Sequence, residues 1–186
     1  MKVSEIICQT MRLVGRETSA QNVEANTATE EDLRLKKAFV TYLNAVLDEL
    51  ARGYFPLDTE ERMQAEDGIY PFADFLKAPS KINRVLRGET PIEWHIYPNY
   101  LQADAKEITV YYEYLPQQLN ETDEFFYPVF AVSARLVEYG MAAEYFLVNG
   151  DGAGYAAWED KYRSEIEMLL SRSASISGRI PPRRWI

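Results

Sequence analysis

The chain has 186 residues, of which 47% are hydrophobic, and a formal net charge of −9 at pH 7. A chain of this length buries about 70% of its unfolded surface, so one compact domain, or one domain with an inserted lobe, is predicted. The single cysteine, Cys8, excludes an internal disulfide and a cysteine-rich zinc site, and the acidic balance disfavours specific binding to a phosphate backbone.

Helical spacing of apolar residues appears first in residues 3–14, and Gly15 ends that pattern. Residues 16–28 are polar and aperiodic, which predicts a loop. A second helix is expected from Thr29, a good N-cap followed by three acidic residues, and its apolar stripe runs to the stop at Gly53 and Pro56.

Short aromatic segments broken by Gly and Pro follow, and they predict an antiparallel β lobe. Residues 81–88, 91–98 and 107–116 resemble strands. The third is the clearest, because Ile108, Val110, Tyr112 and Tyr114 alternate with Thr109, Tyr111 and Glu113.

Helical spacing returns at Pro128 and is interrupted by the segment NGDGAG at residues 149–154. A last helix is expected from Tyr155 to Leu169. The predicted fold is therefore α+β: a four-helix bundle with an inserted antiparallel β lobe and an extended C-terminal tail. The expected boundaries are residues 1–57 and 125–171 for the bundle, 58–124 for the lobe and 172–186 for the tail.

No catalytic residue, metal ligand or cofactor is predicted. His95, the only histidine, lacks an identifiable nucleophile or orienting partner and is expected at the surface, opposite Trp94 and Ile96. NGDGAG lacks the Lys-Ser/Thr of a phosphate loop, so it is interpreted as a turn between helices. The acidic residues 30–32 and 121–124 are expected to stabilise the N-termini of the helices that follow them.

The C-terminal segment carries the strongest signal for a partner. Residues 172–186 contain four arginines and no acid, whereas the other 171 residues carry 16 basic and 29 acidic side chains. Its few apolar side chains cannot offset the entropy of ordering it alone, so a partner is expected to supply a groove and backbone hydrogen bonds. The alternative is a plain disordered terminus. The predicted contact residues for the portal or a neighbouring subunit are Arg179, Ile180, Pro181, Pro182, Arg183, Arg184, Trp185 and Ile186.

The opening VSEIICQTMRLVG and the segment TEEDLRLKKAFVTYLNAVLDELARGYFPL resemble the start of head-to-tail adaptor (connector) proteins of tailed bacteriophages. These comprise the tubular-tail adaptors of short-tailed phages and the related gp6-like connectors. The shared pattern is a short helix ending in Leu-x-Gly, then a long helix with Leu43-Asn44 and Leu47-Asp48 near its end. Residues 126–146 and 158–173 are similar to the family's closing helix pair.

This resemblance implies a structural virion protein without enzymatic activity. Twelve copies, the usual number in the family, would form a dodecamer ring beneath the portal protein. Tail proteins would attach to this ring. DNA would pass through the ring without sequence-specific binding, and the acidic wall would let it slide. The implied location is the head-tail junction of the virion, and the host cytoplasm during assembly.

Two other readings stay open. One is a stopper or tail-completion protein, which would bind the tail instead of the portal. The other is a small hydrolase or ligand-binding domain that uses His95 and acidic residues. Neither a secretion signal nor a membrane span is expected, because charged residues interrupt the apolar runs at 3–14 and 129–148.

Overall fold

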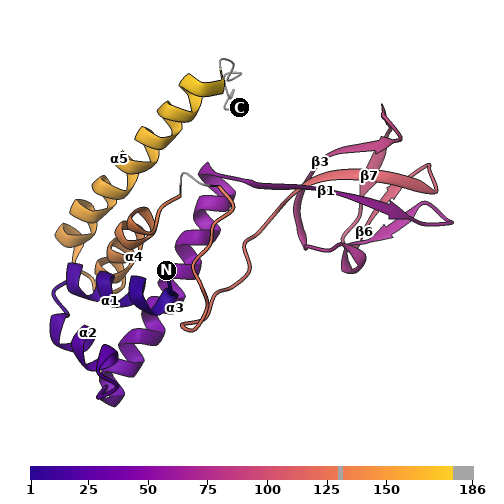
Figure 1. The fold of residues 1–186 in the computed structure, drawn as a ribbon. Helices are drawn as coiled ribbons and strands as arrows, with labels where there is room; N and C mark the ends of the chain where they lie inside the picture. The colour runs from indigo at the N-terminus through magenta and orange to yellow at the C-terminus, as the bar shows by residue number, and fades with distance from the viewer. Residues whose placement is uncertain (130–131, 178–186) are drawn as a thin grey trace. The chain divides into compact units, whose positions relative to one another are not determined.

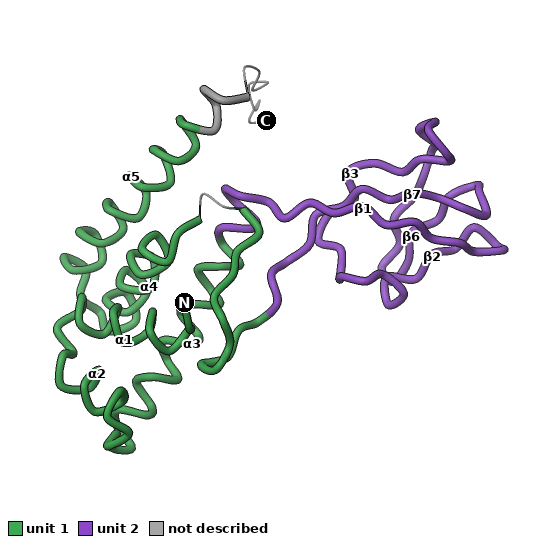
Figure 2. The backbone as a smooth tube through the Cα atoms, viewed as in Figure 1, with its two compact units in different colours: residues 1–49, 118–186 green, residues 50–117 purple. Residues whose placement is uncertain are grey.

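The computed structural model of the protein describes residues 1–129 and 132–177. The chain forms two compact units, one made of residues 1–49 and 118–186 and the other of residues 50–117 (Figure 2). The first unit is helical and the second is built on β-sheets (Figure 1).

The helical unit contains five helices within its described residues. They are α1 (Val3–Leu13), α2 (Glu17–Glu24), α3 (Glu30–Glu49), α4 (Ala134–Val148) and α5 (Gly152–Ser177). A π-helical turn, Leu50–Tyr54, continues α3 into the second unit, where Phe55 N–H donates to the Leu50 carbonyl at 2.7 Å. The long second helix and its stop before Pro56 are thus confirmed.

Helix α4 lies at the centre of the helical unit. Its side chains are buried almost all round, including Leu136, Val137 and Met141, as expected of a helix surrounded by others. Helix α1 contacts it through Thr10 and Met141, and α3 through the stacked rings of Phe39 and Tyr145, whose centroids lie 5.5 Å apart. Helix α5 packs along a third side of α4.

Close packing around α4 depends on one glycine. A Cβ on Gly140 would lie 2.9 Å from both Cγ atoms of Val46 and 3.1 Å from Cε2 of Tyr162. Gly140 therefore lets the backbone of α4 approach α3 and α5 together, and the fully buried Tyr162 fills the space above it.

The prediction of a four-helix bundle is wrong. In such a bundle each helix buries one stripe against a shared axis, whereas here α4 itself forms the core and the other helices surround it. The predicted loop 16–28 contains α2, which buries only Ala20 and so leaves no apolar periodicity in the sequence. Helix α5 also includes residues 172–177, which were predicted to belong to the extended tail. In the sequence, no glycine or proline occurs between Tyr155 and Ser177, and Gly178 is the next one.

Helix α4 begins at Ala134, later than the predicted start at Pro128. The Ser133 hydroxyl accepts a hydrogen bond from Leu136 N–H at 3.3 Å and so caps the first turn. The segment before it is anchored elsewhere: Val3 N–H donates to the Asp123 carbonyl at 2.9 Å, and Phe125 N–H donates to the Met1 carbonyl at 2.9 Å. These bonds hold the segment on the N-terminal end of α1.

The second unit contains two antiparallel sheets. The first has strand order β1-β7-β3-β4 and the second β2-β6-β5. The strands are β1 (Leu57–Gln64), β2 (Ile69–Pro71), β3 (Pro79–Arg87), β4 (Thr90–Pro91), β5 (Trp94–Ile96), β6 (Tyr100–Ala103) and β7 (Glu107–Tyr114). Strand β7 lies between β1 and β3, so it has neighbours on both edges.

Strand β7 confirms the predicted alternation. Ile108, Val110, Tyr112 and Tyr114 are buried, and the residues between them are half-buried. The Tyr112 hydroxyl donates to Glu61 Oε2 at 2.8 Å, and burial together with this bond raises the pKa of Tyr112 to about 12. The tyrosine is therefore a neutral core residue that ties β7 to β1.

Candidate interaction surfaces

The predicted partner-binding residues, 179–186, lie outside the described residues. The described part of the chain offers a pocket beside His95, two acidic segments, the NGDGAG segment and several exposed apolar side chains.

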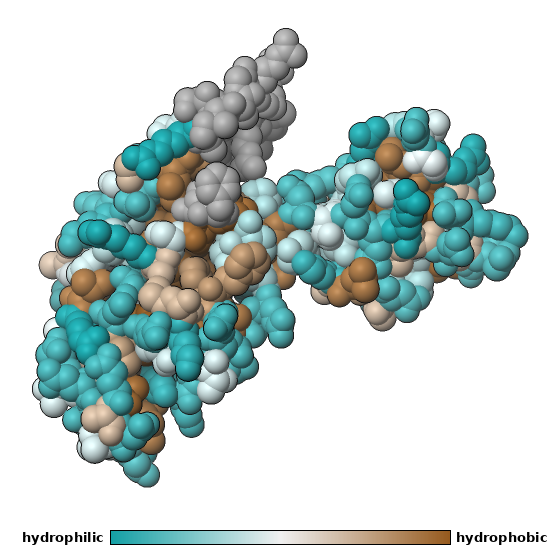
Figure 3. All heavy atoms as spheres, in the orientation of Figure 1, coloured by the Kyte–Doolittle hydropathy of each residue, from teal (hydrophilic) through white to brown (hydrophobic). Residues whose placement is uncertain are grey.

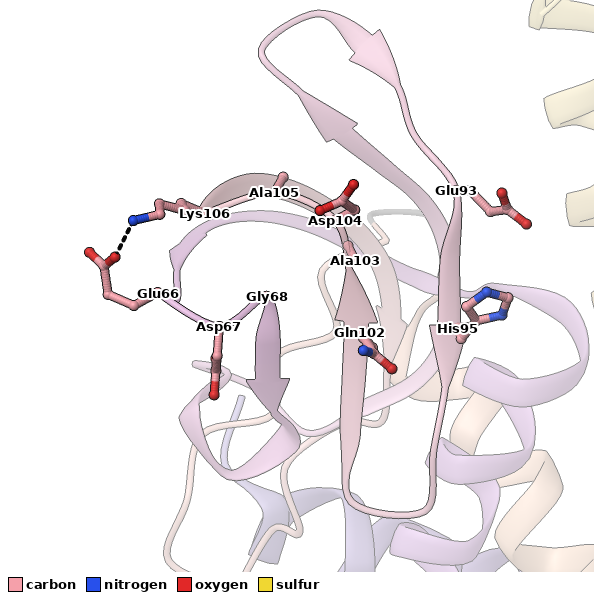
Figure 4. A pocket seen from close by; sticks show the side chains of 10 residues that line it. All are labelled: Glu66, Asp67, Gly68, Glu93, His95, Gln102, Ala103, Asp104, Ala105 and Lys106. Atoms are coloured by element: carbon pink, nitrogen blue, oxygen red, sulfur yellow. Dashed lines mark hydrogen bonds and ion pairs between the residues drawn. The ribbon is translucent and has the colours of Figure 1, made fainter.

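His95 borders a shallow pocket of about 520 Å³ in the β unit. Figure 4 shows Glu93, just before β5, and His95 of β5 on one side, the Lys106–Glu66 ion pair on the other, and Asp104 between them. His95 is exposed, as predicted, but Ile96 is exposed too, although it was predicted to face inward. No hydrogen bond to the His95 ring joins it to any described residue, so the pocket lacks an oriented acid–base pair.

A His95→Ala substitution should therefore change little. An exposed side chain without a partner contributes within about 0.5 kcal/mol to the free energy of unfolding. We expect an unchanged thermal melting curve and unchanged self-association in sedimentation. A loss of any catalytic or ligand-binding activity in this variant would favour the hydrolase or ligand-binding reading instead.

The acidic residues 121–124 do not precede a helix, so their predicted role at a helix N-terminus is wrong. Glu121 forms an ion pair with Lys36 at 2.7 Å, and its backbone carbonyl accepts from Ser4 N–H at 3.2 Å. Asp123 Oδ2 accepts from Asn120 N–H at 2.7 Å. The segment thus secures the connection between α1 and α3.

Asp32, in the first turn of α3, stabilises the N-terminus of this helix, as predicted. Its Oδ2 accepts from Thr29 N–H and from Asn22 Nδ2, each at 3.0 Å, while the Thr29 hydroxyl accepts from Asp32 N–H at 3.2 Å. A hydrogen bond from Ser19 contributes most to lowering the pKa of Asp32 below its usual value, followed by the bonds from Thr29 and Asn22. The carboxylate therefore also links α2 to α3.

The first half of the NGDGAG segment is a turn between α4 and α5, as predicted, whereas residues 152–154 form the first turn of α5, which begins earlier than the predicted Tyr155. Asp151 Oδ1 accepts from Gly154 N–H at 2.9 Å, which caps the start of α5. A Cβ on Gly154 would lie 2.5 Å from the Phe146 ring, so the glycine is needed for packing of α5 against α4. These contacts explain the aspartate and glycines of the segment without a bound phosphate or metal ion.

Large apolar side chains are exposed at both ends of the helical unit. Met1 is exposed and lines a groove with Ser133 and Ala134 at the start of α4. Phe126, which is 75% exposed, follows Phe125, whose N–H donates to the Met1 carbonyl at 2.9 Å. At the end of α4, Leu147 and Val148 are exposed, and Val148 reaches 65%. Leu33 lies at this second end, because α3 runs antiparallel to α4 and places Leu33 before Phe39, the partner of Tyr145.

We name these the first apolar surface (Met1 and Phe126) and the second apolar surface (Leu33, Leu147 and Val148). The first lies near the start of α4 and the second near its end, and a helix of 15 residues is about 22 Å long. Large apolar side chains that are exposed in this way can mark a contact with another protein.

Two carboxyl groups of α4 are held in environments that disfavour their charge. Burial raises the pKa of Glu138, and burial together with Glu159 raises the pKa of Glu144. The folded unit therefore loses stability when these groups are ionised. The sequence did not indicate that Glu138 and Glu144 are shielded from solvent, because an acidic residue in an apolar helix is ordinarily expected to face the solvent.

Lowering the pH from about 7 to about 5 should raise the melting temperature of the helical unit. A raised folded-state pKa means that ionisation of Glu138 and Glu144 destabilises the fold, and this penalty is relieved as the pH falls toward the usual value of 4.5. Asp32 acts in the opposite sense, but its contribution is lost only below its usual value of 3.8. Circular dichroism melting checks the rise, and a Glu138→Gln/Glu144→Gln variant should flatten it.

No helix in the described part of the chain is long and apolar enough to cross a membrane. Among the same residues, no three His, Cys, Asp or Glu side chains are grouped so that they could hold a metal ion. Comparison with protein-family models and with curated proteins found no match to this chain.

Proposed function

We propose that the protein is a structural subunit of a tailed bacteriophage, a head-to-tail adaptor that forms a ring beneath the portal. The resemblance of residues 3–15 and 29–57 to such adaptors supports this assignment. The observation that carries it is the pair of apolar surfaces at opposite ends of α4.

A closed ring needs two different surfaces on each subunit, because every copy contacts one neighbour with one surface and the next neighbour with the other. A two-fold dimer would need only one self-complementary surface. The first and second apolar surfaces differ in their residues and lie at opposite ends of one helix, which suits the head-to-tail arrangement of a ring.

The charge of the chain suits a passage for DNA. Residues 1–171 carry 13 more acidic than basic side chains, so DNA near them is repelled and not retained. In the proposed ring, portal and tail proteins are the partners, and the chain catalyses no reaction. A ring of twelve copies is expected from the resemblance to the adaptor family.

The experiment compares surface variants of the full chain in sedimentation and in binding to a purified portal ring. Phe126→Asp changes the first apolar surface, and Val148→Asp changes the second. Each should leave the melting temperature nearly unchanged and prevent ring formation. Leu76→Asp is the matched control, because Leu76 is 86% exposed but belongs to neither surface.

The control should assemble like the unmodified chain. If the unmodified chain stays monomeric at all concentrations and binds no portal ring, the adaptor proposal is wrong. Binding to tail proteins but not to the portal would instead favour a stopper or tail-completion protein.

A further inference from the structure

The β unit has four outer strand edges, because each of its two sheets ends on two strands. The order of the strands leaves one edge each of β1, β4, β2 and β5 without a neighbouring strand. Backbone groups at such an edge can pair with another chain, so proteins commonly block them with charged side chains or proline. The edge of β1 is blocked by charge, since it carries the exposed Asp58, Glu60 and Arg62.

The edges of β4 and β2 are blocked by proline. The backbone N–H that follows Pro91 donates to the Val85 carbonyl at 3.1 Å, so the nitrogen of Pro91 points outward and offers no hydrogen. Pro71 takes the same outward position in β2. The other outward N–H of β2, that of Ile69, donates to Asp67 Oδ1 at 3.0 Å. Neither edge therefore offers a free donor.

Strand β5 has neither proline nor a charged edge. Tyr97 N–H donates to the Tyr100 carbonyl at 2.9 Å, which makes these two residues a hydrogen-bonded pair. Because such pairs alternate along an antiparallel ladder, the N–H and C=O groups of Trp94 and Ile96 point away from β6. Within the described residues, no strand and no loop backbone pairs with these outward groups. The edge of β5 is therefore open.

The open edge also exposes apolar side chains. Among the residues of the β unit, the large apolar side chains that are exposed are Leu76, Ile96 and Tyr97. Figure 3 shows mostly hydrophilic side chains on the visible face of this unit. Ile96 lies opposite the fully buried Leu101 of β6 and on the same face of the sheet. A further strand beside β5 would cover Ile96 and extend this apolar face.

The opposite face of β5, on which His95 lies, is acidic. It borders the pocket of about 520 Å³, whose lining contains four acidic residues and one lysine. This lysine, Lys106, is already paired with Glu66, whereas no ion pair among the described residues involves Glu93 or Asp104. Side chains on neighbouring strands lie about 5 Å apart, so a cation on this face of an added strand could reach Glu93.

We propose that the outer edge of β5 binds an extended segment of another protein in which basic and apolar residues alternate. Its backbone pairs with Trp94 and Ile96, its apolar side chains cover Ile96, and its basic side chains face Glu93 and the pocket. Charge disfavours a second copy, because two-fold pairing of two β5 strands would place two acidic pockets on one face. The inference goes beyond the proposed ring and does not depend on it.

The test of charge uses the full chain and fluorescent synthetic octapeptides. One peptide alternates arginine with valine, and its control alternates glutamate with valine. In fluorescence anisotropy at low salt, the arginine peptide should bind at least about tenfold more tightly than the control, and added salt should reduce the difference. Glu93→Gln/Asp104→Asn should weaken binding of the arginine peptide. Glu89→Gln, the same change at an exposed residue outside the pocket, should have no effect.

Hydrogen exchange followed at single residues tests strand addition itself. The arginine peptide should slow exchange of the outward N–H groups of Trp94 and Ile96 and leave that of His95, which faces β6, unchanged. Ile96→Pro repeats at β5 the block that Pro71 and Pro91 supply elsewhere, and it removes only an outward donor. Its melting temperature should stay close to that of the unmodified chain, and its binding of the arginine peptide should fall at least about tenfold.

Four outcomes would overturn the inference. Equal binding of the two peptides, or no binding of either, would exclude a basic partner. Unchanged exchange at Trp94 and Ile96 in the presence of bound peptide would exclude strand addition, whether or not Ile96→Pro folds. Loss of self-association in Ile96→Pro without peptide would show that a second copy occupies the edge instead. The adaptor proposal is tested separately, by ring formation of the unmodified chain.

Discussion

Removing residues 178–186 should leave both units folded and abolish stable ring formation and portal docking. The last buried core residue described in the chain is Ile166, so the deletion removes no packing from the described core. It does remove three arginines, a tryptophan and two isoleucines that an isolated subunit has little means to bury. The melting temperature should change by less than about 2 °C, which corresponds to a fraction of a kcal/mol.

A matched control keeps the charge of the segment and changes its geometry. Replacing Arg179, Arg183 and Arg184 by Lys retains three positive charges but loses the planar guanidinium, so assembly should fall to an intermediate level. Normal docking of the truncated chain on a portal ring, measured by pull-down, would contradict the role of the segment.

Gly140→Ala should lower the free energy of unfolding by about 1 kcal/mol. The added methyl would lie 2.9 Å from both Cγ atoms of Val46 and 3.1 Å from the Tyr162 ring, and overpacking of this kind costs about 1–3 kcal/mol. The better helix propensity of Ala, worth about 1 kcal/mol, offsets part of that cost. Urea unfolding followed by the helical circular dichroism signal measures the difference.

Gly152→Ala is the control, because nothing lies within 4 Å of a Cβ at that position of the helical unit. It should be neutral or slightly stabilising. Val46→Ala should cost less in the Gly140→Ala background than in the unmodified chain, since the smaller residue relieves the overpacking. Equal costs in both backgrounds would show that Gly140 and Val46 do not limit the approach of α3 and α4.

The elements that could be predicted are those in which one face is buried and the other is polar. Helix α3 and strand β7 meet this condition, and their buried residues, such as Phe39, Leu43, Val110 and Tyr112, follow the periods of a helix and a strand. The stop at Gly53 and Pro56 and the turn at Asp151 follow from local backbone chemistry, which a sequence carries directly.

The arrangement of the helices could not be predicted, because it depends on contacts around α4. Burial all round a helix produces no single stripe, so the sequence of α4 does not indicate how many neighbours it has. Helix α2 buries one alanine and has no apolar face. The burial of Glu138 beside α1, which lies about 130 residues away in the chain, follows from a contact that no local pattern indicates.

The measurement that tests the adaptor assignment most directly is an electron microscopy reconstruction of the head-tail vertex of a virion that contains this chain. We predict a ring of copies directly beneath the portal, with the helical units of neighbours in contact and an open channel at the centre. Absence of the chain from that vertex, in a virion that carries its portal and tail, would contradict the assignment.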